Sequence, residues 1–378
     1  MCREAGTHKL NRQKTDLYSA VSLRKQEPNG KNMKYDNVYI EALGYELPPF
    51  VLTSAEIETS LAALYEKLHL KPGQLEALTG ISERRYWAPG TMVSQPAAKA
   101  GQKALAKTNI KPEQLGMLIY GGVCRDHLEP ATACAVANII SVGADTHVFD
   151  LSNACLGVVN GMLTAANAIE LDQIEAALVV SCESSRQIMD FTMERMLNEP
   201  DLDTFRKTVA TLTGGSGAAA VLLTNKKLNT TGHRLLGGTY KTAPEHHKLC
   251  IWGPPPGEPA GSFHKMETES VTIMNRGLEL AQETYTGFRK EMAWAPDKPD
   301  KIICHQVGAA NQRHILNLLD IPIAKDFTTF PYLGNIGTVS LPLTAAIAEE
   351  RGFLQPSDLV GFLGIGSGLN CMMLGIKW

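Results

Sequence analysis

The sequence predicts an α/β protein made of two similar layered halves, residues 33–224 and 225–378. Short runs of four to eight apolar residues, typical of buried strands, alternate with longer segments of helical periodicity. Because these runs are apolar throughout, they indicate parallel sheets that helices cover on both faces. The same rhythm then occurs a second time, which indicates the two halves.

The elements of the first half follow one another closely. The core begins at VYIEALGYELPP (38–49), an apolar alternation that ends in two prolines, and Ser54 is the predicted N-cap of the first helix. Helices are then expected near 93–108 and 130–141 and directly after Cys155, and strands at 117–123, 148–151, 176–182 and 217–224.

The second half repeats this order with two interruptions. Its expected elements are a strand at 235–242, a long amphipathic helix at 271–293, a buried strand at 300–307, a helix at 311–319 and a final strand at 359–366. Residues 185–214 and 240–268 interrupt the rhythm, and the second of these segments is rich in Pro and Gly. Such insertions often cover functional sites, although ordinary surface loops fit the pattern equally well.

The composition excludes several classes of function. The 378 residues are 44% hydrophobic and 20% charged, and the net charge of −3 provides no basic field for nucleic acid. The chain has no apolar run of membrane-spanning length, and its N-terminus lacks the apolar segment of a secretory signal. Residues 1–32, with seven basic and three acidic residues, are predicted to be a flexible extension.

The eight cysteines are scattered, without CxxC pairs or Cys/His metal spacing, so no metal site is expected. Most of them are expected to be reduced, buried residues of a cytoplasmic protein. Cys155 differs from the others, because VFDLSNACLGVVNG (148–161) places it between a strand and a helix. A helix N-terminus lowers the pKa of a thiol, which predicts a nucleophilic thiolate at Cys155.

Polar residues at two strand ends of the second half are the candidate partners of Cys155. His305 ends a buried strand, and Asn335 lies between glycines in LGNIGTVSLP. Sites in α/β sheets form at the carboxyl ends of strands, where all three residues are expected to meet. A lone His at a strand end is more often structural, but the three residues together favour a catalytic site.

Two further segments are candidates for the same site. The last expected strand runs into GIGSGLN (364–370), where the backbone N–H groups of Gly366 and Ser367 could form an oxyanion hole with that of Cys155. A dinucleotide site fits these glycines poorly, because no strand is expected to follow them. Glu129, in CRDHLEPATAC, is by itself most simply a solvated loop carboxylate.

The motifs SNACLG, CHQVG, GNIGTVSLP and GIGSGLN together resemble the thiolase superfamily, in its beta-ketoacyl-ACP synthase III branch. The likeness covers about residues 36–378. It implies a five-layer α-β-α-β-α fold, a homodimer, no cofactor, and Cys155, His305 and Asn335 as catalytic residues. Within the branch, RDHLEPATA and NACLGVVNGM are most similar to the OleA-type acyl-CoA:acyl-CoA condensing enzymes. That resemblance implies that Glu129 reaches into the partner chain's active site as a base.

The resemblance implies a condensing acyltransferase. Its expected reaction is the non-decarboxylative Claisen condensation of two fatty acyl-CoAs to a 2-alkyl-3-oxo acid through an acyl-cysteine, in long-chain olefin or ketone biosynthesis. The alternative is beta-ketoacyl-ACP synthase III, which condenses acyl-CoA with malonyl-ACP in fatty-acid biosynthesis. Gln74 and Leu78 stand where that enzyme usually has a Trp and an Arg for CoA, which weakens this alternative.

Two other expectations concern partners. A non-catalytic partner subunit or scaffold for acyl carriers is disfavoured, because such subunits typically lose the nucleophile. Acyl-CoA is the expected ligand, and an acyl carrier protein or a downstream lipid-biosynthesis enzyme remains a possible partner.

Overall fold

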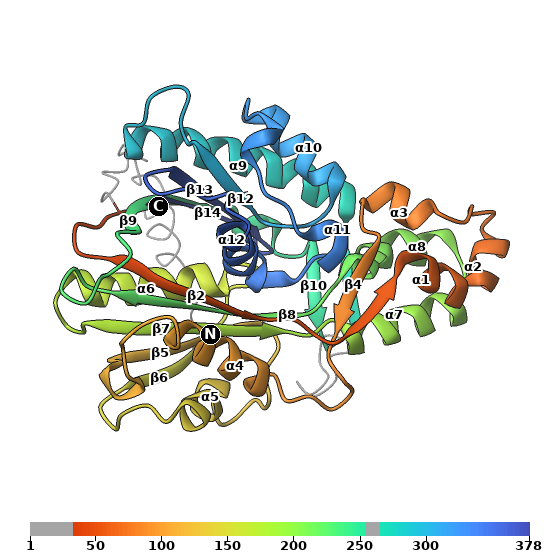
Figure 1. The fold of residues 1–378 in the computed structure, drawn as a ribbon. Coiled ribbons are helices and arrows are strands. Elements are labelled where there is room, and N and C mark those ends of the chain that lie inside the picture. The colour runs from red at the N-terminus through yellow and green to blue at the C-terminus, as the bar shows by residue number, and fades with distance from the viewer. Residues whose placement is uncertain (1–32, 255–264) are drawn as a thin grey trace, which may run out of the picture. The chain divides into compact units, whose positions relative to one another are not determined.

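The frame of the molecule is one ten-stranded β-sheet that consists of two sections (Figure 1). The computed structural model describes residues 33–254 and 265–378, so the prediction for residues 1–32 lies outside the described residues. The sections meet through a single residue pair, Tyr39 with Arg234. The first section, in spatial order, is β6 (His147–Leu151), β5 (Met117–Gly121), β7 (Ala176–Glu183), β8 (Gly217–Thr224) and β2 (Tyr39–Glu46). The second is β9 (Arg234–Thr242), β14 (Asn370–Lys377), β13 (Leu359–Gly366) and β12 (Lys301–Cys304), with β1 (Met33–Lys34) beside β9.

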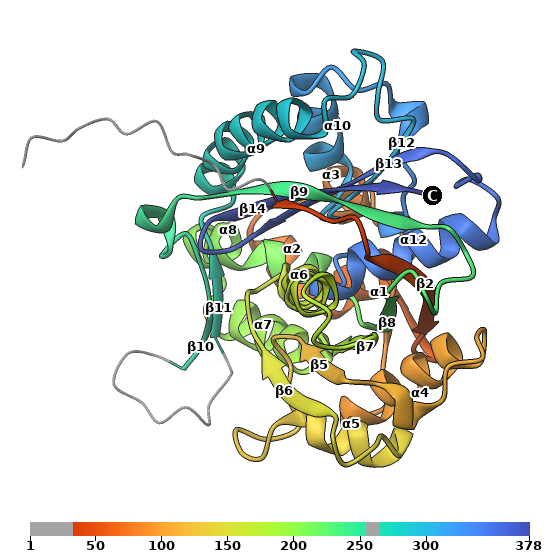
Figure 2. The ribbon, with the colours of Figure 1, turned by 90° about the vertical axis from the view of Figure 1, so that its left-hand side faces the viewer.

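Helices lie on both outer faces of the sheet sections and between them, as Figures 1 and 2 show. This arrangement confirms the predicted five-layer α-β-α-β-α fold. The outer layer of the first section contains α4 (Ser94–Leu105) and α5 (Thr132–Ile140). The central layer contains α6 (Gly157–Glu170) and α12 (Ser340–Glu350), and the last layer contains α9 (Ser270–Met292) and α10 (Ala309–Leu318).

Each contact between layers has its own hydrophobic core. Val158 and Met162 of α6 and Leu341 of α12 pack with Phe362 of β13 between the two sheet sections. Two smaller clusters fill the space under α4 and α5 and under α9 and α10. Burial of these apolar faces is the main favourable term that holds the layers together.

The direction of the strands differs from the prediction. Only the pairs β5–β6, β5–β7 and β12–β13 are parallel, and the other neighbours are antiparallel. The predicted final strand, β13, is also followed by β14, which pairs with it over Leu359–Gly366 and Asn370–Lys377. The first difference arises because an apolar run shows that a strand is buried but not how its neighbours are oriented. The division into halves at residue 224 stays a prediction; β8 ends at Thr224.

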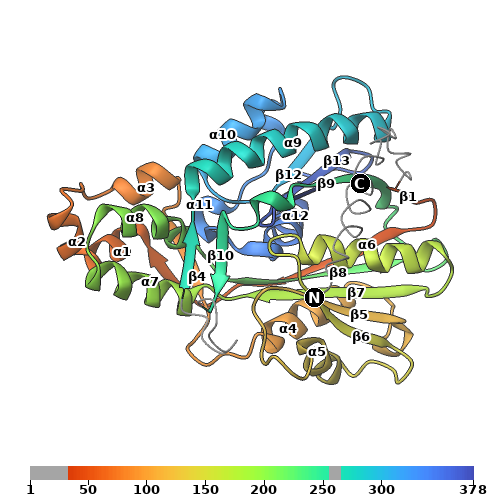
Figure 3. The same ribbon diagram turned by 180° about the vertical axis from the view of Figure 1, so that it is seen from behind.

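Smaller elements gather at one end of the layers, on the side where β4 and β10 are labelled in Figure 3. The helix expected at Ser54 is capped by Thr53 instead: its hydroxyl accepts from the Glu56 N–H (3.1 Å), and Glu56 accepts from the Thr53 N–H (2.7 Å). The elements are β3 (Phe50–Thr53), α1 (Ser54–Ser60), α2 (Ala62–Lys67), α3 (Gln74–Thr79), β4 (Glu83–Tyr86), α7 (Arg186–Asn198), α8 (Leu202–Thr208), β10 (Cys250–Gly253), β11 (Lys265–Thr268) and α11 (Phe330–Leu333). Five 3-10 helices complete the described chain: η1 (Pro112–Gln114), η2 (Val209–Thr213), η3 (Pro244–His246), η4 (Ile323–Lys325) and η5 (Gly337–Val339).

Two expected absences can be compared with the described residues. None of the helices in residues 33–254 and 265–378 is both long enough and apolar enough to cross a membrane. The same residues contain no group of three or more His, Cys, Asp or Glu side chains that could hold a metal ion.

Candidate active site

Cys155 lies in a tight turn between β6 and α6, two residues before the first residue of the helix. Ala154, just before it, has a φ of 44°, in the left-handed region that side chains other than glycine rarely adopt. The start of α6 approaches β5 closely, since a Cβ on Gly121 would lie 2.7 Å from the Gly157 carbonyl oxygen. Glycine at positions 121 and 157 therefore permits this close packing.

Three asparagines connect the turn at Cys155 to the hairpin between β13 and β14. Asn370 donates from Nδ2 to Oδ1 of Asn153 (3.0 Å), and Asn153 donates from Nδ2 to Oδ1 of Asn160 (2.7 Å). In the same hairpin, a Cβ placed on Gly366 would lie 3.3 Å from the backbone nitrogen of Cys155. The structure thus brings the backbones of Cys155 and Gly366 together, and the oxyanion hole with Ser367 stays a prediction.

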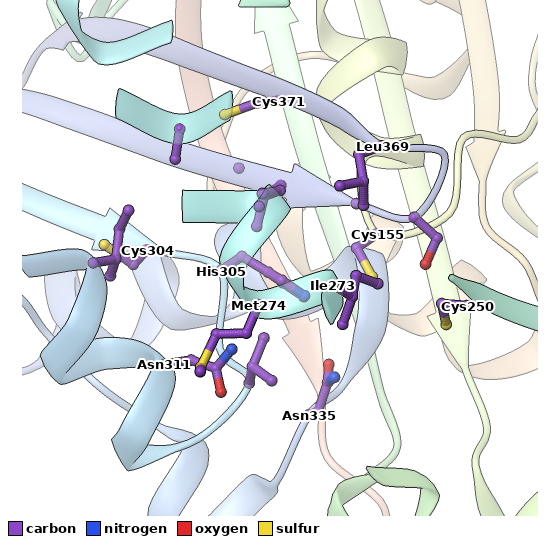
Figure 4. Close-up of a pocket in the computed structure, with 18 of the residues that line it drawn as sticks. Cys155, Cys250, Ile273, Met274, Cys304, His305, Asn311, Asn335, Leu369 and Cys371 are labelled. Atoms are coloured by element: carbon purple, nitrogen blue, oxygen red, sulfur yellow. The ribbon is translucent and has the colours of Figure 1, made fainter. Parts of the chain in front are cut away.

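His305 follows the last residue of β12 and points toward Cys155 (Figure 4). Its backbone N–H donates to the carbonyl of Leu363 (2.9 Å), and its ring Nδ1 lies 2.8 Å from the hydroxyl of Ser340, at the start of α12. Burial lowers the pKa of His305 to about 4. The imidazole is therefore neutral at physiological pH, with a proton on only one of its two nitrogens.

The hydroxyl of Ser340 determines which nitrogen of His305 carries the proton. Ser340 is fully buried, and among the described residues its hydroxyl has no hydrogen-bond partner other than Nδ1 of His305. A buried hydroxyl proton needs an acceptor, so Ser340 donates to Nδ1. His305 then carries its proton on Nε2, where it is a hydrogen-bond donor toward the cavity and cannot accept the thiol proton of Cys155.

We predict that Ser340→Ala lowers kcat by about tenfold with little change in KM, because one neutral hydrogen bond to the ring is lost. Ser340→Thr, which keeps the hydroxyl, should restore most of this loss. The ¹⁵N spectrum of the histidine side chains tests the cause directly: His305 should have a protonated Nε2 in the wild-type chain. A wild-type signal for protonated Nδ1 would contradict the assignment.

Asn335 is held by its backbone and by its side-chain oxygen. Its N–H donates to the carbonyl of Thr213 (2.8 Å), and its carbonyl accepts from the N–H of Gly215 (2.9 Å). Its side-chain Oδ1 accepts from the N–H of Gly337 (3.1 Å), which leaves the Nδ2 group free to donate into the cavity. His305 and Asn335 therefore both present N–H donors to the space beside Cys155.

Two cavities meet at Cys155. The first, of about 240 Å³, extends between α9 and the second sheet section and is lined mainly by apolar residues of α9, β13 and β14, together with His305. The second, of about 350 Å³, extends toward the ends of β7 and β10 and includes Glu183 and Trp252. Cys155, Cys250, Asn335 and Ser367 line both cavities.

Both interrupting segments of the sequence contribute to these cavities. Ala210 and Thr213, from 185–214, and Met266, from 240–268, line both of them. Of the two interpretations that the sequence left open for these segments, covering a site and forming ordinary loops, the structure favours the first. Both segments bring apolar atoms to Cys155, which gives the cavities the character of a binding site for an apolar chain.

The predicted low pKa of the Cys155 thiol is wrong for the unliganded chain. Burial, together with the nearby Glu183 and Cys250, raises the pKa of Cys155 to about 12. Removal of the thiol from water raises the pKa by more than the helix N-terminus lowers it, because the helix begins only at Gly157. The thiol is therefore protonated at neutral pH and loses its proton as it attacks.

The structure places Glu129 away from the cavities of its own chain. Glu129 is exposed in the loop between β5 and α5 and lines neither cavity. The carboxylate that lies near Cys155 is Glu183, which accepts from the backbone N–H groups of Val123 (3.0 Å) and Cys124 (3.3 Å). Sequence reasoning missed Glu183, although it ends the buried strand AALVVSCE, the same signal that identified His305.

Comparison with known proteins agrees with this fold. Models of the 3-oxoacyl-ACP synthase III family match residues 149–244, and models of its C-terminal region match residues 290–378. The acyl-CoA:acyl-CoA alkyltransferase of Shewanella oneidensis is 52% identical over 92% of this chain and its own full length. The enzyme of that name from Xanthomonas campestris is 36% identical over 92% of this chain, while a beta-ketoacyl-ACP synthase III of Streptomyces coelicolor is 26% identical over 90%.

Solved structures show the same relationship. A crystal structure of Xanthomonas campestris OleA superposes with a TM-score of 0.87, at 36% identity, over 93% of this chain and 100% of the other. Another OleA structure, with bound lauric acid and lauroyl-CoA, superposes with a TM-score of 0.85 over 91% of this chain and its own full length. The fold and the site define a thiolase-fold condensing acyltransferase. Within that class, this chain belongs to the family of the OleA-type acyl-CoA:acyl-CoA alkyltransferases.

Proposed function

We propose that this enzyme joins two fatty acyl-CoAs by a Claisen condensation without decarboxylation and forms a 2-alkyl-3-oxo acid. The observation that carries the proposal is the position of Cys155, which lies where two largely apolar cavities meet. One cavity can hold the acyl chain that Cys155 carries, and the other can admit the second acyl chain. Two N–H donors, from His305 and Asn335, face the same point.

The first step transfers an acyl group to Cys155. The sulfur attacks the thioester carbonyl, the bond from carbon to the CoA sulfur breaks, and the thiol proton leaves with CoA as CoA–SH. The protonated thiol of the unliganded chain is compatible with this balance, because the exchange of one thioester for another consumes no proton. The carbonyl oxygen would accept from the backbone N–H groups of Cys155 and the Gly366–Ser367 segment.

The second step forms the carbon–carbon bond. A base removes a proton from the α-carbon of a second acyl-CoA, and the carbanion attacks the acyl group on Cys155. The bond from the acyl carbon to the Cys155 sulfur breaks, and the sulfur leaves as a thiolate that takes up the proton the base had removed. The enolate oxygen accepts from Nε2 of His305 and Nδ2 of Asn335, which stabilise its developing charge. Water then cleaves the thioester of the product to give the oxo acid and CoA.

If Glu129 is the base, it must come from a second copy of the chain, because Glu129 lines neither cavity of its own chain. We infer a homodimer in which the partner subunit supplies this carboxylate, because Glu129 is exposed and its neighbour Leu128 is an apolar residue that is 66% exposed. The adjacent strand β6 is also the last strand of its sheet section, with an edge on which another chain can lie. An exposed apolar side chain beside an open strand edge is typical of a surface that a partner covers.

The proposed chemistry needs no cofactor, since the CoA thioester activates both substrates. A cytoplasmic location is also part of the proposal, and it is supported by the seven described cysteines, all of which are free thiols. An acyl carrier protein or an enzyme that consumes the oxo acid remains a candidate partner.

A single acyl-CoA tests the proposal. Incubation of the chain with myristoyl-CoA and no malonyl-ACP should release more than one equivalent of CoA and yield the oxo acid, or the ketone formed by its decarboxylation. Turnover that requires malonyl-ACP would overturn the proposal and favour beta-ketoacyl-ACP synthase III. Release of CoA with free myristate alone would show hydrolysis instead of condensation.

A further inference from the structure

Helix α9 forms one wall of the first cavity, and its apolar face has a gap. Ile273, Met274, Gly277, Leu278 and Ala281 all line the cavity, at the three- and four-residue spacing that places side chains on one face of a helix. Gly277 is the only one of them without a side chain. Glycine is among the least favourable residues inside a helix, so its presence here calls for a structural reason.

The Ile365 side chain reaches into the space that Gly277 leaves. A Cβ at this position would lie 3.1 Å from Cδ1 of Ile365, a residue of β13 that also lines the cavity. The next residue along β13, Gly366, approaches the backbone of Cys155. Figure 4 shows Ile273 on the Cys155 side of this cavity, and Gly277 lies one helical turn further along α9.

We propose that Gly277 and Ile365 together set the length of the acyl chain that the enzyme accepts. This inference rests on the proposed function, because it takes the first cavity to hold an acyl group. The acyl chain passes beside these two residues, whose contact forms part of the cavity wall, so the width of this passage depends on their side chains. A larger residue at 277 narrows the passage, and a smaller residue at 365 widens it.

The same helix provides a matched control. Gly287 is also a glycine of α9, and a Cβ on it would meet its nearest atom, Cγ2 of Thr239, at the same 3.1 Å. Gly287 lines neither cavity. Substitution at 287 therefore has a similar effect on the helix and on local packing but leaves the passage unchanged.

The test compares Gly277→Ala, Gly277→Val, Ile365→Ala and Gly287→Val on straight-chain acyl-CoAs from octanoyl-CoA to palmitoyl-CoA. The measurements are kcat/KM for CoA release and the mass of the acyl adduct on Cys155. In Gly277→Val, kcat/KM should fall by roughly tenfold or more for the longest acyl-CoAs and stay at the wild-type value for the shortest. Gly277→Ala should shift the chain-length preference in the same direction but by a smaller factor, because the flexible Ile365 side chain can move away from a single added carbon.

Ile365→Ala should shift the preference toward longer chains, and adding it to Gly277→Val should restore the wild-type preference. Gly287→Val should keep the wild-type preference at any activity it retains. An unchanged preference in Gly277→Val and Ile365→Ala would overturn this inference alone. A wild-type chain that forms no adduct with any acyl-CoA would overturn the proposed function, and this inference with it.

Discussion

Cys155→Ala should abolish the acyl-enzyme and lower the rate of condensation by roughly 10⁴-fold or more, as loss of a catalytic nucleophile does in other enzymes. Among the described residues, His305 and Asn335 face Cys155, and Ser340 and Gly337 hold their side chains there, so the donors that assist both steps are arranged around this thiol. Intact-mass measurement after incubation with myristoyl-CoA checks the result: the wild-type chain gains one acyl group, and the variant gains none.

Cys250 provides the control for this experiment. Its thiol lines the same two cavities, so it is exposed to the same acyl-CoA. Cys250→Ala should keep the acyl adduct, and peptide mapping should place it on Cys155. An adduct that persists in Cys155→Ala and disappears in Cys250→Ala would assign the nucleophile to Cys250 and contradict the proposed mechanism.

Two of the residues that the sequence identified, Cys155 and His305, share one property: each follows the end of an apolar run. Cys155 follows the half-buried edge strand β6 and His305 follows the buried strand β12, and the carboxyl ends of such strands meet at one place in an α/β fold. Topology alone therefore predicted that they would come together. Glu183 also lies at the end of an apolar run, of seven apolar or small residues. The sequence did not identify it, because a charged residue in that place can equally mark the boundary of the strand.

Other features depend on contacts between distant segments, which no local pattern contains. Ser340 reaches His305 across 35 residues, and Asn370 reaches Asn153 across 217. The pKa of Cys155 is a property of this same three-dimensional environment. The position of Cys155 before a helix predicted a lower pKa for its thiol. The burial that raises this pKa depends on distant residues, from the insertions and from the β13–β14 hairpin, that lie around Cys155.

The strand order shows the same limit at the level of the fold. Apolar runs such as those of β7 and β8 correctly predicted strands that are buried along their whole length. The sequence predicted parallel pairing of these strands, yet β7 and β8 pair antiparallel, from Ala176 with Thr224 to Glu183 with Gly217. Burial by helices on both faces produces the same composition in either orientation, so only the connection between strands distinguishes the two.

Glu129→Gln should separate the two steps of the reaction. The variant should still form the acyl adduct on Cys155, since acyl transfer needs no carboxylate, but condensation should fall by roughly 10²–10⁴-fold, the usual contribution of a general base. The adduct mass and the yield of oxo acid or ketone measure the two steps in one incubation. Glu129→Asp, which keeps the charge on a shorter side chain, should recover part of the condensation.

A mixture of variants tests whether Glu129 acts across a dimer. Neither Cys155→Ala nor Glu129→Gln should condense acyl-CoA alone. Co-expression in equal amounts should restore about one quarter of the wild-type activity, because half of randomly assorted dimers are mixed and each has one complete site. A carboxylate that served its own chain would leave no complete site in any dimer, so a mixture without activity would show that Glu129 does not act in the partner's cavity. The exposed position of Glu129 favours restored activity in the mixture.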